Sequence, residues 1–308
     1  MNAAIRAVVR TAVYYEREVV GVIRGFQGLI DNEFEPLDSR SVKNILNLGG
    51  TFLKSARSDA FRTKEGRELA YQNCKAAGLD GLVVIGGNGS FTGAHLFTKE
   101  FGVPVIGIPG TIDNDLYGTD FTLGYDSATN VVTECVDKIR DTASSHNRLF
   151  FVEVMGRDTG FIALRTAVAT GALDVILPEG NRTMEELLSE IARGFANRKT
   201  SNIVLVAEGN RLGNTFEIAE RVKAHYPFID TKVTILGHLQ RGGSPSCYDR
   251  VLASKLGVAA VEALFDGKSD MMCGVVNNEV TFTFLQKSIQ NQVPLNMDLL
   301  RISKILSI

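Results

Sequence analysis

The chain has 308 residues, of which 44% are hydrophobic and 22% charged, and its formal net charge is −2 at pH 7. This length predicts one or two globular domains of ordinary composition. The charge balance argues against a broad nucleic-acid surface or a surface for anionic membranes. The apolar runs are shorter than a membrane span, and we recognise no secretory leader. We therefore expect a cytoplasmic protein that binds neither nucleic acid nor membrane.

The four cysteines predict neither a disulfide nor a zinc site. They are widely separated and lack the paired C-x₂-C spacing of zinc ligands. Cys135 falls on the apolar stripe of a predicted helix, where a reduced thiol packs as a small hydrophobe. The others are Cys74, Cys247 and Cys273.

Short apolar, β-branched runs alternate with amphipathic stretches along most of the chain. The strands that this pattern predicts are 18–23, 82–86, 103–108, 149–154, 174–178, 203–207 and 231–236. The predicted helices are 2–15, 63–77, 91–100, 127–142, 160–170, 184–196, 215–225 and 248–266. Alternation of this kind favours mostly parallel sheets with helices on both faces. The pattern is less regular over 275–284 and 285–293.

Several predicted helices begin with a capping signal. Asp126 or Ser127 can cap the helix predicted over 127–142, whose apolar residues recur at i, i+3 and i+4. Reciprocal capping boxes are predicted for Thr183 with Glu186 and for Asn214 with Glu217.

Two glycine-rich turns follow neighbouring predicted strands. Residues 86–90 read Gly-Gly-Asn-Gly-Ser, and residues 107–115 read Gly-Ile-Pro-Gly-Thr-Ile-Asp-Asn-Asp. Glycines let backbone N–H groups approach an anion, and a following helix N-terminus adds a favourable dipole. Asp113 and Asp115 could place one carboxylate on a substrate hydroxyl and the other on Mg²⁺. The sequence therefore predicts phosphoryl-transfer chemistry.

Longer motifs point to a family. Those that carry the resemblance lie at 1–6, 49–57, 86–90, 109–115, 155–157 (Met-Gly-Arg), 237–245 (Gly-His-Leu-Gln-Arg-Gly-Gly-Ser-Pro) and 248–250. In this order they resemble 6-phosphofructokinase of the bacterial ATP-dependent type over essentially the whole chain. The resemblance implies two doubly wound, mostly parallel α/β domains with the active site in the cleft between them, usually in a homotetramer. The implied domains are 1–124 plus 237–290, which bind nucleotide, and 125–236 plus 291–308, which bind sugar phosphate.

The implied reaction is Mg²⁺-assisted transfer from ATP to the 1-hydroxyl of fructose 6-phosphate, giving fructose 1,6-bisphosphate. By resemblance Asp113 is the base that takes the hydroxyl proton, and Arg157 stabilises charge on the transferring group. Thr111 would lie along the path of transfer, and Asp115 would orient the base or bind Mg²⁺. The implied substrate-binding residues are Thr111, Asp113, Asp115, Arg148, Met155, Gly156, Arg157, Glu208, Lys232, His238 and Arg241.

The sugar 6-phosphate would be held by several cations, two of which match residues that reach in from a neighbouring subunit. These two are Arg148 and Lys232. The family typically has Arg at position 232, and Lys keeps the charge but loses the bidentate fork, so we expect weaker substrate binding.

The resemblance favours ATP over pyrophosphate. Pyrophosphate-using relatives usually have Asp and Lys at the positions of Gly89 and Gly110, and glycine leaves room for the nucleoside. The implied nucleotide contacts are Arg57, Arg62, Gly87, Asn88, Gly89, Ser90 and Gly93, with Asn88 and Asp115 at the metal. The implied cations of an effector site are Arg6, Arg10, Arg140 and Lys199, although Leu173 replaces an acidic effector residue.

Two departures leave alternatives open. The family has Asp where this chain has Asn88, and the loss of one negative charge predicts weaker Mg²⁺ binding and slower turnover. Family members also begin with a strand and a Ser-Gly-Gly-Asp-Ala-Pro-Gly loop before the motif that starts here at Met1, so we expect such a segment upstream. The alternatives are an impaired paralogue that binds sugar phosphate as a regulatory subunit, and a pyrophosphate-dependent phosphofructokinase.

Overall fold

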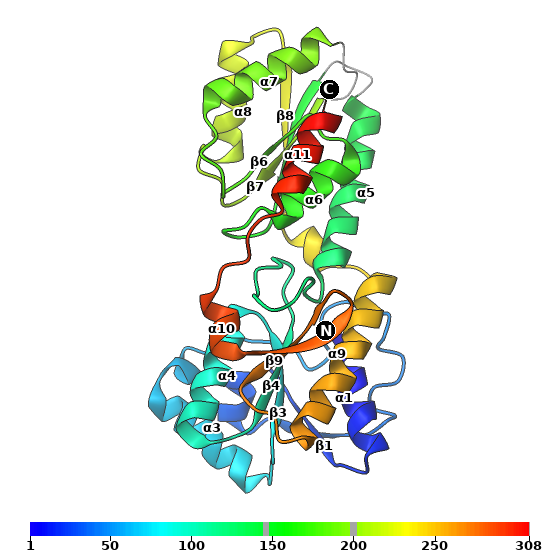
Figure 1. Ribbon diagram of the computed structural model, residues 1–308, viewed down its shortest axis with the longest axis vertical. Coiled ribbons are helices and arrows are strands. Elements are labelled where there is room, and N and C mark those ends of the chain that lie inside the picture. Colours follow the sequence, from blue (N-terminus) through cyan, green and yellow to red (C-terminus); the bar gives the residue numbers. More distant parts are fainter. Residues whose placement is uncertain (144–147, 198–201, 308) are drawn as a thin grey trace. The chain divides into compact units, whose positions relative to one another are not determined.

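The computed structural model describes residues 1–143, 148–197 and 202–307. The chain divides into two compact units (Figure 1). The first comprises 1–111, 115–124 and 243–293, and the second comprises 112–114, 125–242 and 294–308. Residues 237–242 thus cluster with the second unit, whereas the sequence analysis placed 237–290 with the first. The predicted fold class, doubly wound α/β with mostly parallel sheets, is confirmed.

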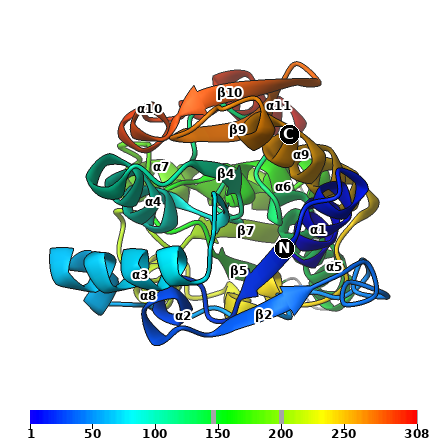
Figure 2. The same ribbon diagram turned by 90° about the horizontal axis from the view of Figure 1, so that it is seen from below.

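The sheet of the first unit has the strand order β10-β9-β4-β3. The parallel strands are β3 (Leu82–Gly86), β4 (Val105–Pro109) and β9 (Met271–Val276), and β10 (Glu279–Phe284) is antiparallel to β9. Side chains of β4 alternate between two hydrophobic clusters, so both faces of this sheet are covered. Helices α1 (Asn2–Tyr14) and α9 (Cys247–Phe265) cover one face, and α3 (Lys64–Ala76), α4 (Asn88–Phe101) and α10 (Leu285–Gln290) cover the other (Figure 2).

A smaller substructure of the same unit precedes α3. It consists of β1 (Val19–Val22), α2 (Phe26–Asp31), β2 (Phe34–Leu37) and the 3₁₀ helix η1 (Ala60–Arg62). β1 and β2 form a separate two-stranded antiparallel sheet. The strand predicted over 18–23 therefore exists as β1 but lies outside the main sheet.

The second unit has the strand order β6-β7-β5-β8, and all neighbours are parallel. The strands are β5 (Arg148–Val154), β6 (Asp174–Ile176), β7 (Asn202–Ala207) and β8 (Asp230–Ile235). The helices are α5 (Tyr125–Ala143), α6 (Phe161–Thr170), α7 (Met184–Ala196), α8 (Thr215–His225) and α11 (Met297–Leu306), with η2 at Gly237–Arg241. Every residue of β7 is buried, as expected for a central strand with helices on both faces.

The structure confirms some local signals and corrects others. Both predicted capping boxes form, at the starts of α7 and α8. Helix α5 begins at Tyr125, so Asp126 and Ser127 lie in its first turn and the prediction that one of them is the cap was wrong. Helix α4 begins at Asn88, three residues before the predicted start, so the glycine turn forms its first turn.

Regular structure also occurs where the sequence pattern was irregular. Strands β9 and β10 form a hairpin whose two-residue turn is Asn277-Asn278, with φ of 51° and 66°. Positive φ at both turn residues is the type I′ geometry that matches strand twist, and Asn tolerates it. Among the described residues, no helix has both the length and the apolarity needed to cross a membrane.

Candidate active site

In the first unit, residues 86–90 and 109–111 of the predicted phosphate turns lie side by side at the carboxyl ends of β3 and β4. The parallel register pairs Gly86 with Pro109, and the Gly110 N–H donates to the Gly86 carbonyl at 2.8 Å. A Cβ on Gly87 would lie 3.4 Å from the Thr111 side chain. The two glycine-rich loops, which are separated by helix α4 in the sequence, therefore meet at one edge of the sheet.

The N-terminus of α4 is built to accept an anion. Gly87 is the N-cap residue and supplies no side-chain hydrogen bond to the first turn. The N–H groups of that turn point out of the helix, and the helix dipole favours negative charge there. A Cβ on Gly89 would meet no atom within 4 Å, whereas one on Gly86 would lie 2.4 Å from Ser90 Oγ. Gly86 is thus required by packing, and Gly89 lies beside open space.

Asn88 and Asp115 form the polar centre of this edge. The Asn88 Nδ2 donates to Asp115 Oδ2 at 2.6 Å. The described residues contain no group of three or more His, Cys, Asp or Glu side chains arranged around a metal position. The pair supplies carboxylate and amide oxygens, the hard donors that Mg²⁺ takes together with water and phosphate.

Three predicted nucleotide contacts lie outside the glycine turn. They are two exposed arginines, Arg57 and Arg62, and Gly93, which packs against aromatic rings. The side chain of Arg62 is 82% exposed, and its Nε lies 3.7 Å from Asp59 Oδ1. Arg57 is also exposed. A Cβ on Gly93 would lie 3.0 Å from the ring of Phe26 and 3.1 Å from the ring of Phe61. Gly93 therefore has a structural reason to be glycine, and its nucleotide contact stays a prediction.

In the second unit, predicted substrate residues gather at the carboxyl ends of three neighbouring strands. The turn 155–157 follows β5, Glu208 follows β7, and η2 follows β8 with His238 and Arg241. Because β7, β5 and β8 are adjacent and parallel, their carboxyl ends share one edge. Ligands of open α/β sheets bind at such edges.

Hydrogen bonds fix the turn after β5. The Glu208 Oε1 accepts from the Arg157 N–H at 2.7 Å and from the Gly156 N–H at 3.3 Å. Arg157 has φ of 54° and Gly156 has φ of 143°, and the first is an uncommon conformation for a residue with a side chain. A Cβ on Gly209 would lie 2.0 Å from the Arg157 carbonyl oxygen. The Arg157 backbone is thus held in one uncommon conformation by Glu208 and by the close approach of Gly209.

Two positioning residues at this edge were missed by sequence reasoning. Gln240 is buried, donates to the Gly237 carbonyl at 3.0 Å and accepts from the Met155 N–H at 3.1 Å. Thr159 donates through Oγ1 to the Asp113 carbonyl at 3.1 Å. Gln240 lies within the motif at 237–245 and Thr159 two residues after the motif at 155–157, but only the tertiary structure shows their hydrogen-bond partners.

Arg148 and Lys232 do not join this edge of their own chain. Arg148 begins β5, about 20 Å from the other end of that strand. Its Nε lies 2.8 Å from Asp230 Oδ2, and the Lys232 Nζ lies 2.8 Å from Asp230 Oδ1. Hydrogen bonds from Lys232 and Arg148 hold the pKa of Asp230 below its usual range. Their role in a neighbouring subunit's site stays a prediction.

The predicted effector cations are divided between the units. Arg6 and Arg10 lie four residues apart on α1, hence on one side of that helix. Arg140 lies on α5 and donates to the Thr170 carbonyl, and Lys199 lies outside the described residues. Leu173 is 2% exposed, in the core of the second unit. The effector site stays a prediction, and Leu173 contributes no ligand to it.

The chain is similar to phosphofructokinases over its whole length. A family model described as Phosphofructokinase matches residues 1–264. The ATP-dependent 6-phosphofructokinase 2 of Bacteroides thetaiotaomicron is 54% identical over 308 residues, which cover 100% of this chain and 94% of that protein.

Solved structures of the same family share the fold. The phosphofructokinase of Saccharomyces cerevisiae superposes with a TM-score of 0.90 at 36% identity, over 94% of this chain and 43% of the yeast chain. This chain therefore spans less than half the length of the yeast protein. A pyrophosphate-dependent phosphofructokinase from Marinobacter aquaeolei, at 22% identity, superposes with a TM-score of 0.83 over 96% of this chain and 82% of that chain.

Proposed function

Because the chain belongs to the phosphofructokinase family, we propose that it transfers the γ-phosphoryl group of ATP to the 1-hydroxyl of fructose 6-phosphate. The products would be ADP and fructose 1,6-bisphosphate. The observation that carries this proposal is the α4 N-terminus, which has no side-chain cap and lies beside the Asn88–Asp115 pair. A backbone anion site next to hard oxygen donors suits a magnesium nucleotide.

We assign the nucleotide phosphates to the first turn of α4. The open space beside Gly89 would accommodate the nucleotide, and Arg57 and Arg62 would add charge. Mg²⁺ would be held by Asn88 and Asp115, where it would neutralise charge on the phosphates. Because Asn88 brings one negative charge fewer than the Asp of the family, we expect this chain to need more Mg²⁺ for full activity.

We assign the sugar phosphate to the carboxyl edge of the second unit. Asp113 would take the proton of the attacking hydroxyl, and the Arg157 guanidinium would stabilise the transferring group. Thr159 supports the backbone of Asp113, and Glu208 supports that of Arg157. Since Glu208 uses Oε1 for these N–H groups, we assign its Oε2 to a sugar hydroxyl. The remaining cations, His238 and Arg241 with Arg148 and Lys232 from a neighbouring copy, would bind the 6-phosphate.

This scheme requires two copies of the chain to share each sugar site. We therefore propose a homo-oligomer, a tetramer by resemblance, that acts in the cytoplasm. The pyrophosphate-dependent and regulatory alternatives are not favoured, because the name of the 54% identical Bacteroides relative and the open space at Gly89 both point to ATP.

A coupled aldolase assay with fructose 6-phosphate and Mg²⁺ tests the proposal. We expect turnover with ATP and none with pyrophosphate. Asp113→Asn should lower kcat by about 10²- to 10⁴-fold while fructose 6-phosphate still binds. Turnover with pyrophosphate alone, or binding of fructose 6-phosphate without any turnover, would replace the proposal by one of the alternatives.

A further inference from the structure

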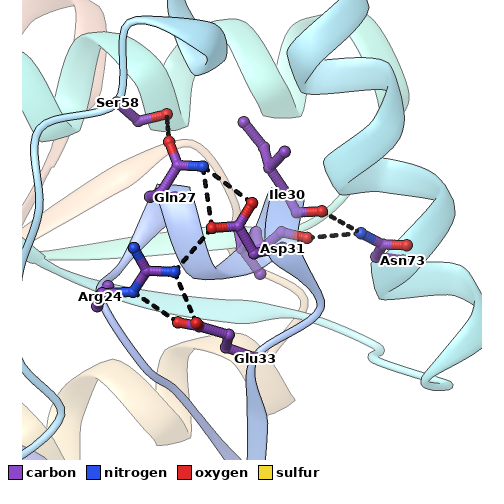
Figure 3. A network of polar contacts seen from close by, with 8 residues as sticks. Arg24, Gln27, Ile30, Asp31, Glu33, Ser58 and Asn73 are labelled. Carbon is purple, nitrogen blue, oxygen red and sulfur yellow. Dashed lines mark hydrogen bonds and ion pairs between the residues drawn. The ribbon is translucent and has the colours of Figure 1, made fainter.

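A polar network surrounds α2 in the first unit, outside the glycine turns (Figure 3). The Arg24 guanidinium donates to Glu33 at 2.8 and 2.6 Å and to Asp31 at 2.7 Å. Asn73 of α3 donates to the carbonyl oxygens of residues 29–30 at 2.9 and 2.8 Å. These contacts fix α2 against its strand pair and against α3.

Gln27 connects this fixed helix to residues 54–62, which we call the arginine loop. Its Nε2 donates to the two carboxylate oxygens of Asp31, at 3.0 Å each, and its Oε1 accepts from the Ser58 Oγ at 2.8 Å. The Ser58 Oγ in turn accepts from the Phe61 N–H at 3.2 Å. Both the oxygen and the nitrogen of the Gln27 amide are therefore hydrogen-bonded. The Ser58 hydroxyl links Gln27 to the backbone of η1.

Aromatic contacts place the arginine loop beside α4. The rings of Phe26 and Phe61 stack with centroids 4.0 Å apart and an interplanar angle of 7°. Gly93 of α4 approaches both rings so closely that a Cβ there would crowd them. Gly93 lies five residues beyond Asn88, about 7 Å along the helix axis. The arginine loop thus packs next to the helix start to which we assign the phosphates.

The two exposed arginines, Arg57 and Arg62, lie on either side of residues 58–61, which the Ser58 hydrogen bonds and the Phe61 ring hold in place. Arg57 directly precedes Ser58, and Arg62 directly follows Phe61. The backbone at Arg62 is held from a second side, because its carbonyl accepts from the Arg67 Nη1 at 2.8 Å. A guanidinium that extends from a fixed backbone loses less freedom on binding an anion than one on a mobile loop.

From these contacts we propose that Gln27 is a positioning residue of the nucleotide site. Through Ser58 it fixes the backbone from which Arg57 and Arg62 reach the bound nucleotide. This inference rests on the proposed function, from which the assignment of the arginines to ATP comes. Because Gln27 contacts neither substrate directly, replacing its side chain should weaken nucleotide binding alone.

The test compares KM values in Gln27→Met, which keeps the length of the side chain and removes both hydrogen-bonding ends. We expect the KM for ATP to rise about threefold to tenfold, the worth of a neutral hydrogen bond, with kcat and the KM for fructose 6-phosphate unchanged. Ser58→Ala should give the same rise, and the double variant should add little to either. Ser58→Thr, which keeps the hydroxyl, should retain the wild-type value.

A matched control is Ser55→Ala, which removes an exposed hydroxyl of the same loop outside the network. Calorimetric binding of ATP to each variant gives a readout that does not depend on turnover. If the wild type binds ATP and neither Gln27→Met nor Ser58→Ala weakens that binding, the inference fails and the proposed function stands. A parallel rise of both KM values would also overturn it, as a general structural effect. If the wild type binds no ATP, the proposed function and the inference fail together.

Discussion

The Asn88–Asp115 pair gives the most specific prediction of this structure. Its Nδ2–Oδ2 distance is 2.6 Å, so Asn88→Asp places a second carboxylate directly against the first. The variant loses a hydrogen bond to a charged group, worth about 1.5–3 kcal/mol. It gains a repulsion of about 4 kcal/mol for two charges 4 Å apart at an effective dielectric constant of 20.

Relaxation and proton uptake reduce this cost, and we expect a net loss of about 3 kcal/mol without metal. For a unit of this size, that lowers Tm by about 6–12 °C. Millimolar Mg²⁺ should restore the Tm of Asn88→Asp, because two carboxylates bind the ion better than one. The wild-type Tm should respond little to Mg²⁺. In the coupled assay, Asn88→Asp should saturate at a lower Mg²⁺ concentration and gain kcat/KM.

The assay is thermal unfolding in EDTA and in Mg²⁺, with Asn130→Asp as a matched control. The Asn130 Nδ2 donates to Asp126 Oδ2 at 3.1 Å, on the exposed surface of α5. The same exchange of amide for carboxylate there should cost little and show no Mg²⁺ response, because solvent screens the pair. If Asn88→Asp has the wild-type Tm in EDTA and ignores Mg²⁺, the assignment of this pair to the metal is wrong.

Three further predictions follow from burial and packing in the first unit. Burial raises the pKa of Cys273 to about 12, so a thiol reagent at pH 8 should label exposed Cys247 and leave Cys273 unmodified until the protein unfolds; equal labelling rates would contradict this. Arg67 pairs with Glu100 at 2.6 Å and holds the pKa of that carboxyl below its usual range, so Arg67→Met should cost about 3 kcal/mol in urea unfolding at pH 7. A carboxyl whose pKa is lower in the folded state stabilises that state above its unfolded pKa, and this stabilisation is lost as the pH falls. The difference in unfolding free energy between wild type and Arg67→Met should therefore shrink below about pH 4, and a difference that is constant with pH would show that the ion pair is not its cause. Gly107→Ala should cost about 1–3 kcal/mol in the same assay, since the new Cβ would lie 2.7 Å from a core phenylalanine ring, and an unchanged midpoint would contradict that packing.

Sequence reasoning located the central elements because their signals are local and strong. Strands β5 and β7 are built on apolar runs, residues 149–152 and 203–207, and the capping boxes that start α7 and α8 are complete in sequence. It did not find α2, α11 or the β9–β10 hairpin, which are short or depend on tertiary packing. Asn277-Asn278 is a recognisable type I′ turn signal in retrospect.

The candidate site was predicted as residues and not as contacts. Motifs at strand ends predicted which residues gather in each unit, because the carboxyl ends of neighbouring parallel strands lie at the same edge of a sheet. The hydrogen bonds that position them depend on side-chain approach across elements. The bond from Thr159 to the Asp113 carbonyl and the bond from Gln27 to Ser58 have no signature in sequence spacing.

The most direct test of the proposed reaction is to follow the label from [γ-³²P]ATP in the presence of fructose 6-phosphate. Aldolase cleaves fructose 1,6-bisphosphate so that the 1-phosphate leaves in dihydroxyacetone phosphate and the 6-phosphate in glyceraldehyde 3-phosphate. We predict label in dihydroxyacetone phosphate with the wild-type chain, and incorporation at least about 10²-fold slower with Asp113→Asn. Label that never enters an aldolase-cleavable product, or label carried equally by the Asp113→Asn variant, would contradict the assignment of reaction and base.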